Sequence, residues 1–258
     1  SELSSQIKTA FNKAFVQPDG RIQGDTQSAY ALALDFDLLP EALRPKAVEH
    51  LLEGIQRYNG HASTGIHGTR SLLLELSATG HNDVAYSLVT QHTFPSWGYM
   101  LDMGATTLWE RWDGYVADRG FQNHTAMNSL NHVVFGSVGE WLWRNVVGLA
   151  PDDSSPGYKH FVIDPRPGGG LTWAKGSYDS VRGLIATEWK IEKGFFSLDI
   201  VVPPNTSASV HLPSTDTSKI QENGSAISGN GQVRFVGVDS GSAVFEVQSG
   251  EYHFHCPM

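Results

Sequence analysis

Carboxylates and tryptophans gather between residues 97 and 143, which hold five of the seven tryptophans in the chain. At the centre of this region, Glu110 and Asp113 are interleaved with Trp109 and Trp112, and Trp97 precedes them. An indole ring can stack on the apolar C–H face of a pyranose, while a carboxylate accepts hydrogen bonds from sugar hydroxyls or activates water. A carboxylate flanked by indoles is also partly desolvated, which raises its basicity. This combination predicts a carbohydrate site.

Each of these residues also has a structural interpretation. Tryptophan-rich segments more often belong to a core than to a ligand platform. Glu110 and Arg111 could form a local ion pair, because perturbed carboxylates also occur in structural networks. The polar segment 123–132 follows, in which His132 could orient a carboxylate or donate to a sugar hydroxyl, although a single histidine is more often structural.

Glu140 is a further acidic candidate in the same region. Ser137 and Glu140 fit the S-x-x-E pattern of a capping box in front of an apolar stripe, so we expect a structural role for Glu140. This interpretation fails if the helix begins earlier, near Ser129.

Other kinds of site are not supported. His253 and His255 would point the same way from a strand and Cys256 the opposite way, so a third ligand is lacking and we expect no metal. The glycine-rich stretches Gly168-Gly169-Gly170 and Gly229-Asn230-Gly231 match neither a dinucleotide fingerprint nor a P-loop. No G-x-S-x-G stretch presents a nucleophilic serine. We expect no cofactor.

Composition excludes several classes of protein. The 18 Lys and Arg against 27 Asp and Glu give a net charge of −9 without a basic block, so a nucleic-acid partner is not expected. The sequence contains no run of 18 apolar residues, so a membrane-spanning helix is not predicted. The lone Cys256 excludes a disulfide framework. The sequence starts at Ser1 without a secretory signal, which suggests a processed chain or a fragment and leaves the compartment unknown.

The elements that must position these residues change type near residue 150. Up to that point apolar residues recur at intervals of three and four, as in amphipathic helices, with the clearest faces over 30–38, 48–58 and 138–149. Prolines and glycines separate the faces, which predicts short connections and helical hairpins. We expect six or seven helices and one helical domain over residues 1–152.

From about residue 160 the apolar period becomes two. The alternation predicts strands near 185–191, 196–202, 208–212, 233–235, 245–247 and 252–254, with a turn at Pro203-Pro204-Asn205. Seven or eight short strands predict an antiparallel β-sandwich over residues 153–258. Helices followed by a block of strands argue for two domains, joined through the polar, breaker-rich stretch 151–157.

The stretch Ser96–Gly114 resembles the signature of bacterial-type α-L-rhamnosidases, glycoside hydrolase family 78. His67 departs from the family pattern, because apolar residues are commoner there in relatives. The resemblance keeps its order over nearly the whole chain. The other matching stretches are 26–34, 64–69, 131–142, 171–178 and 203–208.

The resemblance implies an (α/α)6 barrel followed by a β-sandwich, and hydrolysis of terminal α-L-rhamnosides with inversion. It makes Glu110 the general base and His132 a residue that lines the rhamnose pocket. Trp97, Trp109, Trp112 and Asp113 become further substrate-binding candidates. Inversion needs a second carboxyl group, roughly 6.5–9.5 Å from the first. The motif that carries the family's general acid, of the type D-x-x-Q-R-D-E-x-x-G-W, is absent from this sequence.

The helix count also indicates only the C-terminal half of a barrel. The inner helical faces would then be uncovered unless the N-terminal half or another chain packs on them. The first hypothesis is therefore part of an inverting α-L-rhamnosidase that acts on rhamnose-containing glycosides and is incomplete by itself. The second is a non-catalytic carbohydrate-binding or accessory protein that uses the cluster from Trp97 to Trp112. A third keeps the barrel and changes the sugar.

Overall fold

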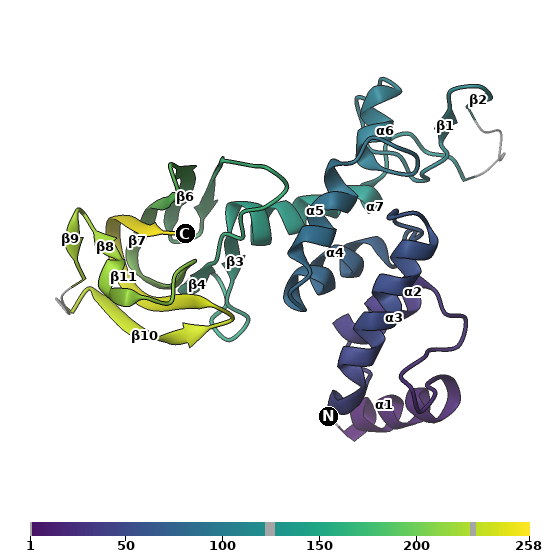
Figure 1. Cartoon of the computed structure of the whole chain (residues 1–258), viewed down its shortest axis with the longest axis horizontal. Helices are drawn as coiled ribbons and strands as arrows, with labels where there is room; N and C mark the ends of the chain where they lie inside the picture. The colour runs from purple at the N-terminus through teal and green to yellow at the C-terminus, as the bar shows by residue number, and fades with distance from the viewer. Residues whose placement is uncertain (1, 122–126, 228–230) are drawn as a thin grey trace. The chain divides into compact units, whose positions relative to one another are not determined.

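The computed structural model describes residues 2–121, 127–227 and 231–258 (Figure 1). The chain forms two compact units, Ser1–Trp141 and Leu142–Met258, which we call the helical unit and the β unit. The units meet between residues 141 and 142, whereas the sequence suggested a boundary between 152 and 153. No helix within the described ranges is long and apolar enough to cross a bilayer.

Helical hairpins form the core of the helical unit, as the period of three and four predicts. Helix α4 packs against α2, α5 and α8, and its residues Leu72, Leu73 and Leu76 are buried. A three-residue connection, 79–81, joins α4 to α5, and Gly80 in it adopts φ +86°, which favours glycine. The elements are α1 (Glu2–Phe15), α2 (Gln27–Asp35), the 3-10 helix η1 (Glu41–Leu43), α3 (Arg44–Arg57), α4 (Thr69–Ala78), α5 (Asn82–Thr90), α6 (Trp97–Asp102), β1 (Tyr115–Val116), β2 (Gly120–Phe121), α7 (Val133–Gly136) and α8 (Val138–Trp141).

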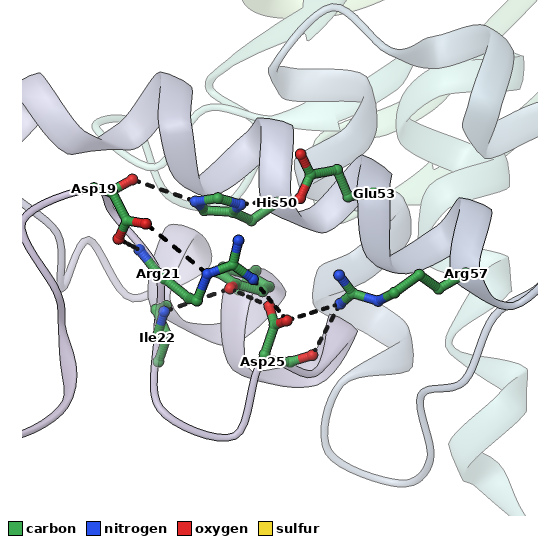
Figure 2. Close-up of polar contacts among 8 residues, drawn as sticks. Asp19, Arg21, Ile22, Asp25, His50, Glu53 and Arg57 are labelled. Carbon is green, nitrogen blue, oxygen red and sulfur yellow. Dashed lines mark hydrogen bonds and ion pairs between the residues drawn. The ribbon is translucent and has the colours of Figure 1, made fainter.

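A polar network fixes the start of α2 against α3 (Figure 2). The Asp25 carboxylate accepts a hydrogen bond of 2.5 Å from the Tyr30 hydroxyl and pairs with Arg21 at 2.8 Å and Arg57 at 3.2 Å. His50 on α3 contacts the Asp19 carbonyl through Nε2 at 3.3 Å. Charged side chains from the 19–25 loop and from α3 therefore hold the two helices together.

The predicted capping box at Ser137 is wrong. Helix α7 already begins at Val133, with His132 as its N-cap, and Ser137 lies at its C-terminal end. The buried Ser137 hydroxyl has no hydrogen-bond partner in the described part of the chain. Glu140 instead forms a two-pronged ion pair with Arg70 on α4, with N···O distances of 2.5 and 2.8 Å. Glu140 therefore has a structural role, as expected, but it joins α8 to α4 and does not cap a helix.

The predicted helical stripe over 138–149 changes type along its length. Helix α8 ends at Trp141, and the π-helix η2 (Leu142–Val147) begins the β unit. Two carbonyls of η2 accept hydrogen bonds from strand β6, one from Trp189 Nε1 to Val146 at 2.6 Å and one from Thr187 Oγ1 to Val147 at 2.9 Å. These bonds attach η2 to the sheet that follows it.

The β unit is built on a mixed sheet. Strand β4 runs parallel to β7, and every other strand pair in the described residues is antiparallel, so the purely antiparallel prediction is wrong at this pair. A parallel pair needs a crossover, and the β5–β6 hairpin provides it because it lies between β4 and β7 in sequence. The elements are β3 (Leu149–Pro151), β4 (His160–Ile163), β5 (Trp173–Ser180), β6 (Gly183–Glu192), β7 (Phe195–Leu212), the 3-10 helix η3 (Thr217–Lys219), β8 (Gln221–Glu222), β9 (Ser225–Ala226), β10 (Val233–Asp239) and β11 (Ser242–Pro257).

Two long strands replace four of the predicted short ones. The predicted turn at Pro203-Pro204-Asn205 lies inside β7, where the register against β11 shifts between Gln248 and Gly250. A proline cannot donate to a ladder and is tolerated at such an irregularity, so the sequence signal marks a bend and not a break. The two halves of β7 share one core, which includes Leu198, Ile200, Val210, Leu212, Phe245 and Phe254.

Candidate active site

Glu110 lies in an irregular segment that a second irregular segment holds in place. The backbone amide of His132 donates to the Leu108 carbonyl at 2.8 Å, and the amide of Glu110 donates to the Ser129 carbonyl at 2.9 Å. The Asn128 side chain donates to the Gly114 carbonyl at 3.0 Å. Residues 107–114 and 128–132 are thus joined at several points without forming a regular helix or strand.

The same pairing orients the Glu110 side chain. The Ser129 amide donates to Glu110 Oε2 at 2.9 Å, so the residue is fixed through both its backbone and its carboxylate. Glu110 lines a cavity although the residue is only 7% exposed. A nearly buried carboxylate with one oxygen held by an amide and with access to a cavity can accept a proton from a bound water.

The cavity beside Glu110 has a volume of about 510 Å³. This size is typical of small-molecule sites, which span roughly 300–1,000 Å³. Aromatic and apolar side chains dominate its wall, with charged groups at Glu110, Arg111 and Asp113. The lining residues are Tyr58, Ala62, Ser63, Thr64, Gly65, Ile66, Phe94, Pro95, Glu110, Arg111, Trp112, Asp113 and Phe135.

The three candidate tryptophans have different environments. Trp112 lines the cavity, stacks on Phe135 with ring centres 3.8 Å apart, and donates from Nε1 to the Thr64 carbonyl at 2.8 Å. Trp97 is buried, meets Trp112 edge-on at 4.9 Å and donates to the Phe135 carbonyl. Trp109 is buried as well. Trp112 is therefore placed to contact a ligand in the cavity, with Trp97 packed against it.

Asp113 lines the cavity as part of a bidentate ion pair. Arg111 donates to its two oxygens at 2.9 and 3.0 Å. The hydrogen bonds with Asp113 raise the pKa of Arg111. Arg111 therefore pairs with Asp113. The structural interpretation of the sequence had instead paired Arg111 with Glu110.

His132 is half-buried and is not among the described residues that line the cavity. Its Nδ1 accepts a hydrogen bond from the Val134 amide at 3.3 Å, which caps α7. An accepting Nδ1 leaves the ring proton on Nε2 in the neutral form. Residues 123–126 of the polar segment preceding it lie outside the described residues.

Sequence reasoning missed several residues of the cavity. Tyr58 was assigned to a buried helical face, yet it is 56% exposed and lines the cavity, as does Phe94. A tyrosine directly before Asn59-Gly60, where the helix ends, was the available signal. Thr64 and Gly65 had been noted only as part of a matching stretch.

The described residues contain no group of three or more histidine, cysteine, aspartate or glutamate side chains arranged to hold a metal ion. His253 pairs with Asp199 at 2.7 Å, His255 stacks on Phe195, and Cys256 is buried on the opposite side of the strand.

Comparison with known proteins gives matches over both units. Residues 1–146 match the sequence model of the bacterial alpha-L-rhamnosidase 6 hairpin glycosidase domain. Residues 148–226 match that of the bacterial alpha-L-rhamnosidase C-terminal domain.

Similar proteins are longer than this chain. An alpha-L-rhamnosidase of Streptomyces avermitilis is 46% identical over 254 residues, which are 98% of this chain and 24% of that protein. An alpha-L-rhamnosidase of Formosa agariphila is 35% identical over 254 residues, which are 98% of this chain and 27% of that protein. The chain thus spans about a quarter of the length of these relatives.

Solved structures agree with these matches. The structure of the Streptomyces avermitilis alpha-L-rhamnosidase complexed with L-rhamnose superposes with a TM-score of 0.91 and covers 98% of this chain and 24% of that one. An alpha-L-rhamnosidase from Dictyoglumus thermophilum, 33% identical, superposes with a TM-score of 0.86 over 100% of this chain and 28% of that one.

Proposed function

The chain belongs to the bacterial α-L-rhamnosidase family, and from this premise we propose that it supplies the general base and part of the sugar pocket of an inverting α-L-rhamnosidase. In that enzyme the helical unit would form part of an (α/α)6 barrel and the β unit a β-sandwich. The observation that carries the proposal is Glu110, a carboxylate held by the Ser129 amide in the wall of an aromatic-lined cavity.

The proposed reaction needs one water and two carboxyl groups. Glu110 accepts a proton from the water, whose oxygen bonds to the anomeric carbon of rhamnose while the glycosidic C–O bond breaks. The leaving oxygen takes a proton from the general acid. Attack from the face opposite the leaving group inverts the configuration, and the two carboxyl groups then lie roughly 6.5–9.5 Å apart. We assign the acid to sequence beyond these 258 residues, because they lack the family's acid motif.

The cavity wall suits the apolar face of a deoxy-sugar. Trp112, fixed by its stacking on Phe135 and its bond to Thr64, presents an aromatic surface that needs no rearrangement on binding. Asp113, oriented by Arg111, can accept hydrogen bonds from hydroxyls. The L-rhamnose bound in the Streptomyces avermitilis relative supports this choice of sugar.

The test uses a chimera in which this chain replaces the matching 24% of the Streptomyces avermitilis enzyme. Glu110→Gln should lower kcat on an aryl α-L-rhamnoside by about 10²–10⁴-fold, the usual contribution of a general base. Glu41→Gln, at an exposed acidic residue of η1, should leave kcat unchanged. Parental turnover in the Glu110→Gln chimera would end the assignment.

A second readout separates the base from a residue that only maintains the pocket. Azide is already anionic and needs no base, so it should restore turnover to Glu110→Ala and give a rhamnosyl azide of inverted configuration. A pocket defect would not respond to azide. If the unmutated chimera binds L-rhamnose in calorimetry without hydrolysing the glycoside, a carbohydrate-binding accessory role replaces the enzyme.

A further inference from the structure

The outer face of one end of the β unit's sheet carries an ordered row of charged side chains. Lys175, Glu188, Asp199 and His253 lie directly opposite one another on the adjacent strands β5, β6, β7 and β11. Their neighbours along each strand point into the core, so these four side chains share the solvent face. Strands lie about 4.8 Å apart, and the row therefore spans about 14 Å.

A second row beside the first forms the floor of a groove. Ser177, Ala186, Val201 and Glu251 are again direct cross-strand partners, and small or apolar side chains occupy its middle. Both rows line a cavity of about 760 Å³. A neighbouring hollow of about 450 Å³ continues from it and shares Val201 and Glu251.

The charged row contains an unfavourable pair. Glu188 and Asp199 are directly opposite each other, and like charges in such positions destabilise a sheet. Each has a polar partner: the Lys190 ammonium lies 2.7 Å from Glu188, and His253 Nδ1 lies 2.7 Å from Asp199. The hydrogen bond with Lys190 lowers the pKa of Glu188, so this carboxylate stays ionised at neutral pH.

Much of the hydrogen-bonding capacity in the groove is unused. In the described part of the chain, the side chains of Lys175, Ser177 and Glu251 have no hydrogen bond, and those of Glu188 and Asp199 each use one carboxylate oxygen. The groove therefore presents a donor at Lys175, acceptors at Glu188, Asp199 and Glu251, and a hydroxyl at Ser177. A hydroxyl group donates and accepts at once, so a polyol can bridge neighbouring side chains here in a way that a purely cationic or anionic ligand cannot.

An aromatic side chain lies on the same face. Trp173 precedes Lys175 by two residues on β5, is opposite Lys190, and is 55% exposed. An exposed indole beside a row of hydrogen-bonding groups can stack on the apolar face of a sugar ring. The carboxylates of Glu188, Asp199 and Glu251 outnumber Lys175, which disfavours an acidic polysaccharide.

We propose that this groove, lined by Lys175, Glu188, Asp199, His253 and Glu251, is a binding site for a neutral oligosaccharide. All of its residues belong to the β unit, so binding here is independent of Glu110 and of the proposed hydrolysis.

The experiment is an array of neutral and uronic-acid-containing oligosaccharides probed with the whole chain, followed by calorimetry on the strongest neutral ligand. Asp199→Ala should weaken that ligand about tenfold or more, because it removes hydrogen bonds to a charged group. Trp173→Ala should weaken it about fivefold. Asp239→Ala alters an exposed carboxylate at the end of β10 and should have no effect. These side chains are exposed, so melting temperatures should match the parent.

Three outcomes would overturn the proposal. The first is that no neutral oligosaccharide on the array binds the chain, or that oligolysine displaces the bound ligand and neutral sugars do not. The second is binding that survives Asp199→Ala but disappears in Trp112→Ala, which would assign it to the helical unit. The third is loss of binding in the longer chimera, because a protein segment would then cover the groove. Retained binding in Glu110→Gln, with loss in Asp199→Ala, supports the groove whether or not the chimera hydrolyses rhamnosides.

Discussion

Replacing Asp25 by asparagine tests whether the polar network in Figure 2 stabilises the helical unit. The side chain connects the 19–25 loop to Tyr30 on α2 and Arg57 on α3. Asp25 adopts φ +45°, a conformation that asparagine tolerates as well as aspartate, so Asp25→Asn changes the charge without new backbone strain.

The magnitude follows from the partners of the carboxylate. The Tyr30 residue is fully buried, and a hydrogen bond to a charged group contributes about 1.5–3 kcal/mol. Arg21 and Arg57 are 35% and 44% exposed, and such pairs contribute about 0–1 kcal/mol each. Asparagine keeps an acceptor for the hydroxyl, so we expect a loss of about 1–2 kcal/mol in the free energy of unfolding at pH 7.

The pH dependence follows from the direction of the pKa shift. The Tyr30 hydrogen bond, followed by the charges of Arg57 and Arg21, lowers the pKa of Asp25 from 3.8. A lowered folded-state pKa gives stability that is present above the unfolded value and is lost as pH falls through the folded value. The difference in the free energy of unfolding between the parent and Asp25→Asn should therefore be largest at pH 7 and should shrink as the pH falls below about 4.

Urea unfolding followed by circular dichroism at 222 nm measures this gap at pH 7 and at pH 3. Asp118→Asn is the control, because that side chain is 82% exposed and lies 4.0 Å from its arginine partner. Burial raises the pKa of Tyr30 to about 12, so its hydroxyl remains a donor throughout this range. A gap that stays constant between the two pH values, or is no larger than that of Asp118→Asn, would refute the reasoning.

Two further predictions concern the β unit. Gly176→Ala should cost about 1–3 kcal/mol in unfolding free energy, because the added Cβ would lie 2.8 Å from both Trp143 and Val147 and these side chains would have to shift. Gly237→Ala, whose Cβ meets nothing within 4 Å, is the control, and equal melting temperatures for the two variants would contradict the contact. Burial raises the pKa of the Cys256 thiol to about 11, so at pH 8 roughly one thiol in a thousand is ionised. Iodoacetamide should modify Cys256 only in urea, and labelling of the folded chain at the denatured rate would argue against a buried thiol.

The hydrophobic periods predicted the regular elements well and their interruptions less well. The face over 48–58 became α3, and the alternation over 185–191 became part of β6. The prolines at 203 and 204 predicted a turn, yet β7 continues through them because β11 accommodates the bend with its own register shift. A local signal cannot distinguish a strand end from a bulge, because the partner strand decides between them.

The candidate site could be located from the sequence, but its composition could not be resolved. Residue types alone drew attention to Glu110, Trp112 and Asp113, all of which line one cavity. Nothing local separates Trp112 from the buried Trp109, because the difference depends on Phe135 and Thr64, which are distant in sequence. Tyr58 was assigned to the buried face of a helix, although α3 ends at Arg57, directly before it.

Catalysis by Glu110 would require a rigid carboxylate, and Glu110 lies in a segment without regular structure. The contacts between 107–114 and 128–132 resolve this conflict, because the Ser129 backbone both accepts from the Glu110 amide and donates to its carboxylate. A side chain held through its own backbone and its terminal oxygen loses little further freedom when substrate binds. The pairing of these two loops therefore provides the precision that a regular element provides elsewhere in the fold.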